Sequence, residues 1–226
     1  YYDHVVADTS GLALSTLINR ISTNHTYFYR ESAHFHFFTG ELDKIILAQE
    51  QSGQRSIRIW SAGCSSGEEA YTLGMILDDV MGAVAHNWEL GILATDISEN
   101  ALQKASLAVY PDENVRNLPL NFKFKYLSAQ PGKQWKVNRQ VQDKVMFRRF
   151  NLMNEHFPFK RRFHAIFCRN VMIYFDQQSK DRLLRNFSLY LYNGGKLFLG
   201  LSESLGRTNK DFKYVQPGIY EKVTTE

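Results

Sequence analysis

The sequence predicts an α/β protein built on a Rossmann-like parallel sheet, with a small antiparallel β-subdomain inserted at about residues 120–144. Three observations predict this class. Short apolar runs alternate with stretches of helical spacing, which is the pattern of βαβ units. A glycine-rich turn follows an early apolar run, at a position where such folds bind ligands. Residues 120–144 interrupt the alternation with a pattern typical of a hairpin.

The 226 residues, of which 44% are hydrophobic, are enough for one sizeable core. Residues 1–22 have leucines and isoleucines at helical spacing and no initiator methionine, so we expect a linker helix cut at its start. Residues 23–226 are expected to form the folded domain. Its first helix is predicted over Ser32–Gln51, because the Phe, Leu and Ile side chains there share one face.

Two strands, each followed by a helix, are expected to form the first half of the sheet. In order, these are the strand Ile57–Trp60, the turn Ser61–Gly67, the helix Glu68–Val80, the strand Leu90–Ala94 and the helix Glu99–Ser106. Ser98 can cap the second helix. The glutamates in the first turn of the helix Glu68–Val80 suit the positive end of its dipole.

The insertion is predicted from aromatic side chains that alternate with lysines. Phe122, Phe124 and Tyr126 follow this pattern, which indicates a strand. The turn Gln130–Lys133 then separates it from a second expected strand that reaches Val141. Together these segments predict a small antiparallel hairpin.

The insertion is also strongly basic. Residues 121–149 carry eight basic side chains and one acidic side chain. Such a cluster is either a solvated face or a docking surface for an acidic partner. Trp135 and Tyr126 are the aromatic side chains that could anchor such a partner.

The α/β pattern resumes after the insertion. The expected elements are the strands Val145–Phe150 and Ala165–Cys168, the helix Asp176–Tyr192, the strand Lys196–Leu201, and the hairpin strands Phe212–Val215 and Ile219–Val223. We expect Gly194-Gly195 to end the long helix.

The composition excludes several classes of protein. Two cysteines cannot form a disulfide framework or a four-cysteine zinc site, and no histidine pair has metal-binding spacing, so we expect no metal. No apolar run approaches the roughly 18 residues that cross a bilayer, and the first residues lack a signal-peptide pattern. We therefore expect a cytoplasmic protein without direct membrane insertion.

The turn Gly63–Gly67 and Asp96 together favour an adenosine-type ligand. Small residues in the turn let a ligand approach the backbone, and Asp96 ends the second strand, where Rossmann-like folds bind ribose hydroxyls. The turn lacks the middle glycine of G-x-G-x-x-G and has no G-K-[ST], so a nucleoside without phosphates fits better than NAD. The alternatives are a tight turn without a ligand and an aspartate that merely begins a turn.

Polar residues at the ends of two later predicted strands are expected at the same edge of the sheet as the glycine-rich turn and Asp96. Asn151-Leu152 and Arg169-Asn170 follow apolar strands, whose carboxyl ends line the ligand crevice in open α/β sheets. Tyr174 lies just beyond. Alternatively, Asn170 begins a turn and Tyr174 packs on the core. The segment Asn24–Arg30 is dense in polar and aromatic groups. The alternative interpretation of this segment is the start of a helix with Thr26 as its N-cap.

These residues together resemble a known family, the chemotaxis receptor glutamate methyltransferases, or CheR family. The matching stretches are Asn24–Arg30, Arg58–Tyr71, Leu93–Ile97, Phe150–Leu152, Ile166–Asp176 and Gly194–Gly200. The departures are modest: Tyr29 stands where Phe is usual, Ser66 where Thr is usual, and Ala70 where Pro is common. The Cys168–Asp176 stretch is highly specific, whereas the glycine turn alone is not.

The resemblance implies a fold, a cofactor and a set of site residues. The fold is that of S-adenosylmethionine (SAM)-dependent methyltransferases with an inserted antiparallel subdomain. The family also carries an N-terminal helical domain, of which residues 1–22 would be the remnant linker. The residues expected to bind SAM are Asn24, Thr26, Arg30, Gly63, Glu69, Asp96, Asn151, Leu152, Arg169 and Asn170. Arg30 and Tyr174 are expected nearest the methyl transfer.

The implied reaction moves a methyl group from SAM to glutamate side chains of membrane chemoreceptors, leaving S-adenosylhomocysteine. The expected partner is the cytoplasmic domain of such receptors, and in some members their C-terminal tail binds the inserted subdomain. Two alternatives remain: a SAM-binding regulatory module without turnover, and a methyltransferase acting on RNA or a small molecule. No RNA-binding motif is present, so we expect no nucleic-acid partner.

Overall fold

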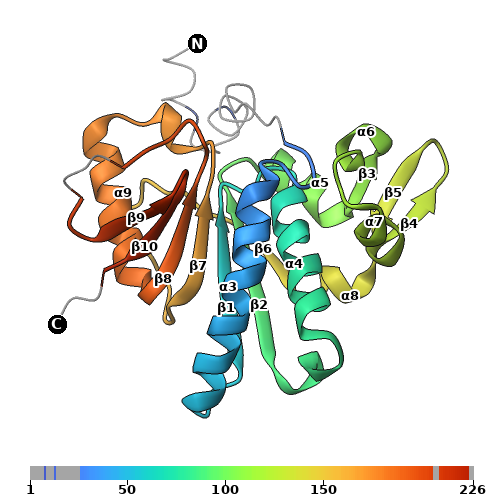
Figure 1. The fold of residues 1–226 in the computed structure, drawn as a ribbon. Helices are drawn as coiled ribbons and strands as arrows, with labels where there is room; N and C mark the ends of the chain where they lie inside the picture. Colours follow the sequence, from blue (N-terminus) through green and yellow to red (C-terminus); the bar gives the residue numbers. More distant parts are fainter. Residues whose placement is uncertain (1–7, 9–12, 14–25, 206–208, 224–226) are drawn as a thin grey trace.

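The structure is a computed structural model that describes residues 8, 13, 26–205 and 209–223. Asn24 and nearly all of the expected helix over residues 1–22 lie outside the described residues. The expected helix at Ser32–Gln51 is confirmed with the same bounds and is labelled α3 (Figure 1). Because it begins at Ser32, Thr26 does not cap it, and residues 26–31 form a separate segment before the helix.

A seven-stranded sheet forms the centre of the molecule, in the order β6-β2-β1-β7-β8-β10-β9. The strands are β1 Ser56–Ala62, β2 Glu89–Asp96, β6 Val145–Arg149, β7 Phe163–Cys168, β8 Leu191–Leu199, β9 Phe212–Gln216 and β10 Ile219–Lys222. The first five strands in that order are parallel to one another. The strand β10 is antiparallel to both of its neighbours, β8 and β9. The chain moves outward from β1 to β2, while β7 pairs on the other side of β1. This reversal makes a switch point beside β1, where open α/β sheets bind ligands.

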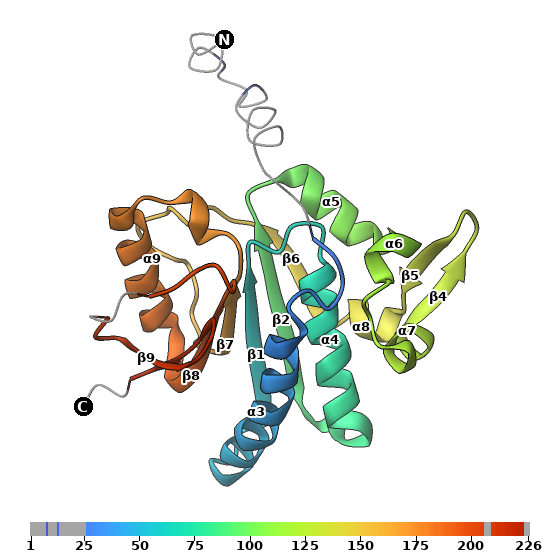
Figure 2. The ribbon, with the colours of Figure 1, turned by 45° about the horizontal axis from the view of Figure 1, so that its top comes forward.

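Helices cover both faces of the sheet. They are α3, α4 Glu68–Met81, α5 Glu99–Leu107 and α9 Gln177–Tyr190, with short 3₁₀ turns η1 Gly82–Asn87 and η2 Met172–Tyr174. The expected N-cap Ser98 of α5 is confirmed, and Asp176, expected as the first residue of the long helix, is the N-cap of α9. Figures 1 and 2 show α3 and α4 together in front of the sheet and α9 at its other side.

Alternating strand residues build a separate core on each face. Ile57 and Ile59 of β1 pack in the cluster that includes α3 and α4. Trp60 and Ala62 of the same strand pack in the cluster that includes Phe187 of α9. Because both faces of β1 are covered, six of its seven residues are buried, as in strands at the centre of a parallel sheet.

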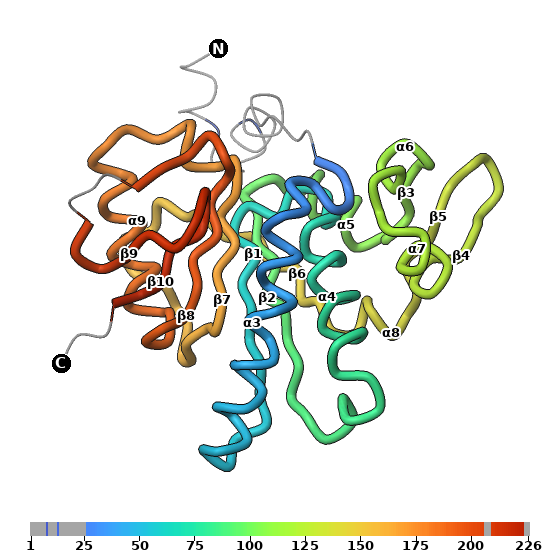
Figure 3. The backbone as a smooth tube through the Cα atoms, in the orientation of Figure 1, coloured from blue at the N-terminus to red at the C-terminus, as the bar shows by residue number. Residues whose placement is uncertain are grey.

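The inserted subdomain lies between α5 and β6, at the side of the molecule away from α9 (Figures 1 and 2). Its three strands, in the order β3-β5-β4, are β3 Val109–Pro111, β4 Leu127–Gln130 and β5 Gln134–Val137. Its short helices are α6 Asp112–Val115, α7 Leu120–Tyr126 and α8 Arg139–Gln142. Figure 3 shows the chain leaving the main body and returning to it through these elements.

The prediction of a strand over Phe122–Tyr126 is wrong, because this segment is the helix α7. Phe122 and Tyr126 lie four residues apart and are both buried, whereas Phe124 is 72% exposed. These two positions lie on the same face in a strand and also in a helix, so the sequence pattern fits both structures. The packing of the two buried side chains favours the helix. Val141 likewise lies on α8 and not on a strand. An antiparallel hairpin around the Gln130–Lys133 turn is confirmed, but its first strand is β4, which follows the predicted one.

The glycine pair 194–195 does not end the long helix. The helix α9 ends at Tyr190, and β8 runs through both glycines. Phe163 pairs with Leu191 while Ala165 pairs with Lys196, so β8 bulges between those positions. Gly194 has φ +74° there, and a Cβ on Gly195 would lie 2.8 Å from the Tyr192 carbonyl oxygen. The glycines therefore permit a bulge in a strand.

Candidate active site

A cavity of about 500 Å³ lies where β1, β2 and β7 end, beside the switch point of the sheet. Its size is within the range of small-molecule sites. Ten of the residues predicted for the site line it: Thr26, Arg30, Gly63, Glu69, Asp96, Asn151, Leu152, Arg169, Asn170 and Tyr174. Segments far apart in the sequence thus meet in one place.

The glycine-rich turn is fixed against the end of β2. The backbone N–H groups of Gly63 and Cys64 both donate to the Thr95 carbonyl oxygen, at 2.8 and 2.9 Å. Gly63 has φ +87°, and a Cβ at this position would lie 2.4 Å from a methyl carbon of Val171. Only glycine fits both the conformation and the close approach of the Val171 loop.

Asp96 is held by the same turn. Its Oδ2 accepts from the Ser65 N–H at 2.8 Å and its Oδ1 from the Ser98 N–H at 2.9 Å. Burial raises the pKa of Asp96, although these N–H donors act in the opposite direction. Each carboxylate oxygen has two acceptor sites, so the side chain can still accept from a pair of neighbouring hydroxyls.

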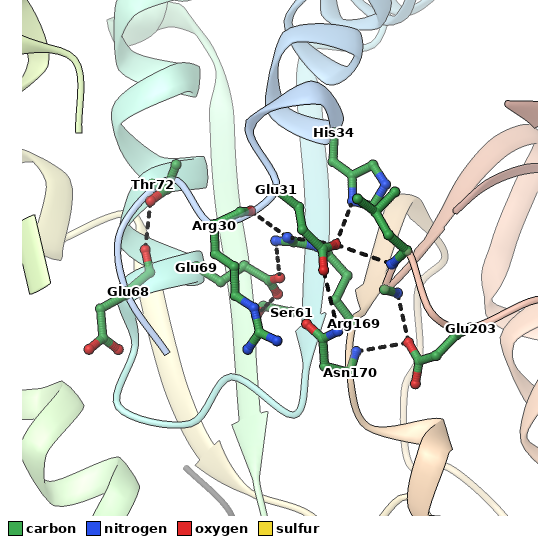
Figure 4. A network of polar contacts seen from close by, with 12 residues as sticks. Arg30, Glu31, His34, Ser61, Glu68, Glu69, Thr72, Arg169, Asn170 and Glu203 are labelled. Carbon is green, nitrogen blue, oxygen red and sulfur yellow. Dashed lines mark hydrogen bonds and ion pairs between the residues drawn. The ribbon is translucent and has the colours of Figure 1, made fainter. Parts of the chain in front are cut away.

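Arg169 is the centre of a polar network (Figure 4). Its side chain is 3% exposed and lies between two carboxylates. Nη1 donates to Glu69 Oε2 at 3.0 Å, and Nη2 donates to Glu31 Oε2 at 3.1 Å and to the Arg30 carbonyl oxygen. Ser61 donates its hydroxyl to the other oxygen of Glu69 at 2.6 Å. Arg169 is therefore already neutralised by protein groups.

Glu31 is a site residue that the sequence analysis missed. It adopts the left-handed conformation with φ 56°, directly before α3. Burial alone would raise its pKa, but Arg169 and Asn170 outweigh this and hold the pKa below its ordinary value. The carboxylate also accepts from the Leu201 N–H at 3.3 Å. Its partners come from the ends of β7 and β8, so no local pattern in the sequence points to it.

Arg30 and Tyr174 differ in their placement. In Figure 4 the guanidinium of Arg30 extends away from the contact between its own carbonyl and Arg169. Tyr174 ends the 3₁₀ turn η2 and is 61% exposed. It lines the cavity without packing in the core, so the alternative of a core tyrosine is wrong.

The two cysteines are buried, and burial raises the pKa of both thiols. Neither is therefore a thiolate nucleophile at neutral pH, although Cys64 lines the cavity. In the described ranges, no cluster of three or more His, Cys, Asp or Glu side chains is arranged to hold a metal ion.

Comparison with known proteins shows the family to which the chain belongs. Residues 24–220 match the family model described as "CheR methyltransferase, SAM binding domain". The chain belongs to the CheR methyltransferase family. A chemotaxis protein methyltransferase of Borreliella burgdorferi is 43% identical over 98% of this chain and 78% of its own length. A chemotaxis protein methyltransferase of Escherichia coli is 35% identical over 90% of this chain and 68% of its own length.

Membership of the CheR family confirms the predicted fold class, the SAM cofactor and a SAM-dependent methyltransferase that acts in chemotaxis. A solved structure of the glycopeptide N-methyltransferase MtfA with sinefungin is a more distant match, at 12% identity and a TM-score of 0.44 over 85% of this chain and 60% of that chain. Among the described residues, no helix is both long enough and apolar enough to cross a bilayer.

Proposed function

We propose that this CheR-family chain transfers the SAM methyl group to glutamate side chains of chemoreceptor cytoplasmic domains. The observation that carries the proposal is the lack of a poised base. No histidine or lysine is among the described residues that line the cavity. Glu69 is bonded to Ser61 and Arg169, and Asp96 to backbone N–H groups. An acceptor that needs no deprotonation fits such a site, and a glutamate, with an ordinary pKa near 4.3, is already ionised.

The proposed place of SAM follows the chemistry of the lining groups. Asp96 accepts from the ribose hydroxyls at the end of β2. Glu69 faces the cavity as a carboxylate and receives the ammonium group of the methionine part. Asn151 and Leu152 lie beside the adenine, and Thr26, Asn170 and Gly63 complete the wall. The same role is proposed for Asn24.

Arg30 is the proposed guide for a carboxylate. Two arginines are among the described residues that line the cavity, and Arg169 is committed to Glu31 and Glu69. A guanidinium fork can align a carboxylate in two parallel hydrogen bonds. Tyr174, at the exposed rim, shapes the opening through which the acceptor reaches the methyl group. In-line attack then moves the methyl to the glutamate oxygen and leaves S-adenosylhomocysteine.

Methyl transfer from labelled SAM tests the function. The protein would be incubated with [methyl-³H]SAM and a receptor cytoplasmic fragment, RNA or no acceptor. We expect label on the receptor fragment alone, released as methanol at alkaline pH because a methyl ester hydrolyses there. A fragment with glutamines in place of its exposed glutamates is the control and should stay unlabelled. Label on RNA would favour an RNA methyltransferase, and binding of SAM without transfer to any acceptor would favour a regulatory module.

We further propose that the inserted subdomain docks an acidic segment of the receptor, such as its C-terminal tail. Part of its positive charge is offset within the protein, since Lys123, Lys125 and Lys144 pair with Asp112, Asp79 and Asp78. In the described part of the chain, Lys133 and Lys136 make no ion pair; Lys133 lies in the turn between β4 and β5, and Lys136 lies on β5.

The structure changes the aromatic part of this proposal. Tyr126 is fully buried and cannot anchor a partner. Trp135 is partly accessible, but its ring already carries Lys123 at 4.2 Å and its N–H donates to Asp112 at 2.7 Å. The exposed apolar side chains of the subdomain are instead Leu120 and Phe124, one turn apart on α7.

Charge reversal tests the docking surface. In Lys133→Glu/Lys136→Glu we expect slower association with a receptor fragment and an unchanged SAM affinity, because surface charges mainly steer association. Binding by the wild-type protein should weaken with added salt, as the Debye length is about 8 Å at physiological ionic strength. Reversal of Lys210, on the other side of the molecule, is the matched control. If neither added salt nor the double substitution changed the association rate, the hairpin would be an ordinary solvated face and not a docking surface.

A further inference from the structure

Glu203 is a buried carboxylate just behind the proposed site. It lies on the connection between β8 and β9, is 8% exposed, and is not among the residues that line the cavity. Its Oε2 accepts from the backbone N–H of Asn170 at 2.8 Å and of Gly200 at 2.6 Å. Its Oε1 accepts from the Ile173 N–H at 3.1 Å. One side chain thus binds the end of β8 and both ends of the segment between Asn170 and Ile173 (Figure 4 shows part of these contacts).

We propose that Glu203 is a positioning residue for methyl transfer, acting through the loop that follows β7. This loop carries Asn170 at the cavity wall and Tyr174 at its rim. The inference rests on the proposed place of SAM in the cavity. Glu203 does not line the cavity, so it would contact neither the cofactor nor the acceptor and would affect them only through the loop.

The conformation of Asn170 shows why the loop needs this support. Asn170 has φ 58°, in the left-handed region that asparagine tolerates better than most residues. Its backbone N–H lies beyond the end of β7, which is Cys168, and donates to the Glu203 side chain instead of to a neighbouring strand. Without the Glu203 carboxylate, the N–H groups of Asn170, Gly200 and Ile173 would lose their acceptor. Each buried donor left unsatisfied is costly, so the loop would move.

A glycine keeps the approach of the two segments tight. A Cβ on Gly200 would lie 2.4 Å from Asn170 Nδ2, 2.9 Å from its backbone nitrogen and 2.9 Å from Glu203 Oε2. The Asn170 side chain, in turn, donates to Glu31 Oε1 at 3.4 Å. Glu203 and Glu31 therefore fix the backbone and the side chain of the same cavity residue from two directions.

The substitutions Glu203→Ala and Glu203→Gln test this role. We expect Glu203→Ala to weaken SAM binding about tenfold or more in calorimetry and to lower kcat with a receptor fragment, because three backbone N–H groups, those of Asn170, Ile173 and the buried Gly200, lose their acceptor. Glu203→Gln keeps one acceptor oxygen and should recover part of both losses. Folding is checked in each variant by its thermal midpoint, and affinities are measured well below the lowest midpoint.

Glu41→Ala is the matched control. Glu41 is also 8% exposed and pairs with Lys196 of β8, at 2.9 Å, outside the cavity lining. We expect it to lower the thermal midpoint while SAM affinity stays at the wild-type value. Equal losses of SAM affinity in the Glu41 and Glu203 variants would show that Glu203 contributes only to the stability of the fold, and would overturn the inference.

Two further outcomes separate this inference from the function on which it rests. If Asp96→Ala weakens SAM binding while both Glu203 variants keep wild-type affinity and kcat, the placement of SAM stands and the role of Glu203 is wrong. If Asp96→Ala also leaves SAM binding unchanged, the placement of SAM fails and the inference falls with it.

Discussion

Arg169 and Arg30 line the same cavity, and we propose different roles for them. Arg169 is buried between Glu31 and Glu69, and moving it toward a ligand would leave two carboxylates without their partner. A buried charge pair of this kind holds a site in shape. The role that we propose for Arg30, which also lines the cavity, is to orient a carboxylate there.

Substitution of Arg30 and Tyr174 should therefore have unequal effects. We expect Arg30→Ala to lower kcat/KM for methyl transfer about 100-fold or more, because a misaligned reactant loses the contribution of positioning. Tyr174→Phe should keep measurable turnover, since its hydroxyl moves no proton in the proposed reaction. Steady-state kinetics with a receptor fragment measures both. Loss of all turnover in Tyr174→Phe at normal SAM affinity would assign that hydroxyl a chemical role.

The sequence could predict a residue such as Asp96 because its position follows from a local pattern. It comes directly after an apolar strand, and strand ends meet at one edge of a parallel sheet. Glu31 and Glu203 could not be predicted in this way. Glu31 binds Arg169 and Asn170 across more than a hundred residues, and Glu203 binds Asn170 across the length of α9 and β8. Only the folded chain brings such partners together.

At the scale of elements, the turn after β1 is the most constrained part of the site. Its N–H groups bond to the end of β2, Tyr110 of β3 donates its hydroxyl to the Ser66 carbonyl at 2.6 Å, and Asn114 of α6 donates to Glu68 at 2.8 Å. The inserted subdomain is thus bonded to the turn that borders the cavity. Removal of the subdomain would deprive the turn of these contacts.

Gly63→Ala tests the constraint on this turn. The new Cβ meets Val171 at 2.4 Å in a backbone with φ +87°, so we expect a loss of about 1 kcal/mol or more in unfolding free energy and weaker SAM binding. Gly132→Ala is the control, because Gly132 has φ +75° but no heavy atom within 4 Å of its added Cβ. Urea unfolding and SAM calorimetry should separate the two variants. Equal SAM affinity in both would contradict the close approach of Val171.

The elements themselves were predictable where one period dominated the sequence. The helix α3 follows from a long helical pattern of apolar residues, and the buried strand β1 from a short apolar run before a glycine-rich turn. The segment Leu120–Tyr126 was ambiguous because its aromatic residues satisfy both alternation and helical spacing. The Gly194-Gly195 pair was misassigned because glycines serve a strand bulge as well as a helix end, and the partner strand decides between them.

At the scale of the whole molecule, burial of His164 couples stability to pH. The ring is buried on β7, its Nδ1 accepts from the Arg58 N–H at 3.0 Å, and burial together with Arg58 lowers its pKa to about 4 from an ordinary 6.5. The unfolded chain therefore binds a proton between pH 6.5 and 4 that the folded chain does not. The stability that His164 contributes is complete above pH 6.5 and is lost as the pH falls toward 4, by at most about 3 kcal/mol.

His164→Asn should reduce this pH dependence, because an asparagine oxygen can accept from Arg58 without taking up a proton. Urea unfolding at pH 7.5 and 4.5 would compare it with the wild type and with His86→Asn, which changes an exposed histidine. We expect the smaller loss of unfolding free energy at pH 4.5 in His164→Asn alone. Identical pH dependence in all three proteins would refute this assignment.

We propose that SAM binds in the cavity at the ends of β1, β2 and β7, with its ribose on Asp96. Calorimetric titration of SAM into the wild-type protein, Asp96→Ala and Asp78→Ala tests it most directly. Asp78 pairs with Lys144 outside the cavity lining and serves as the control. Loss of charge-assisted hydrogen bonds should cost Asp96→Ala about 1.5–3 kcal/mol, or about 10-fold to 150-fold in affinity, with Asp78→Ala unchanged. Unchanged SAM affinity in Asp96→Ala would contradict the claim.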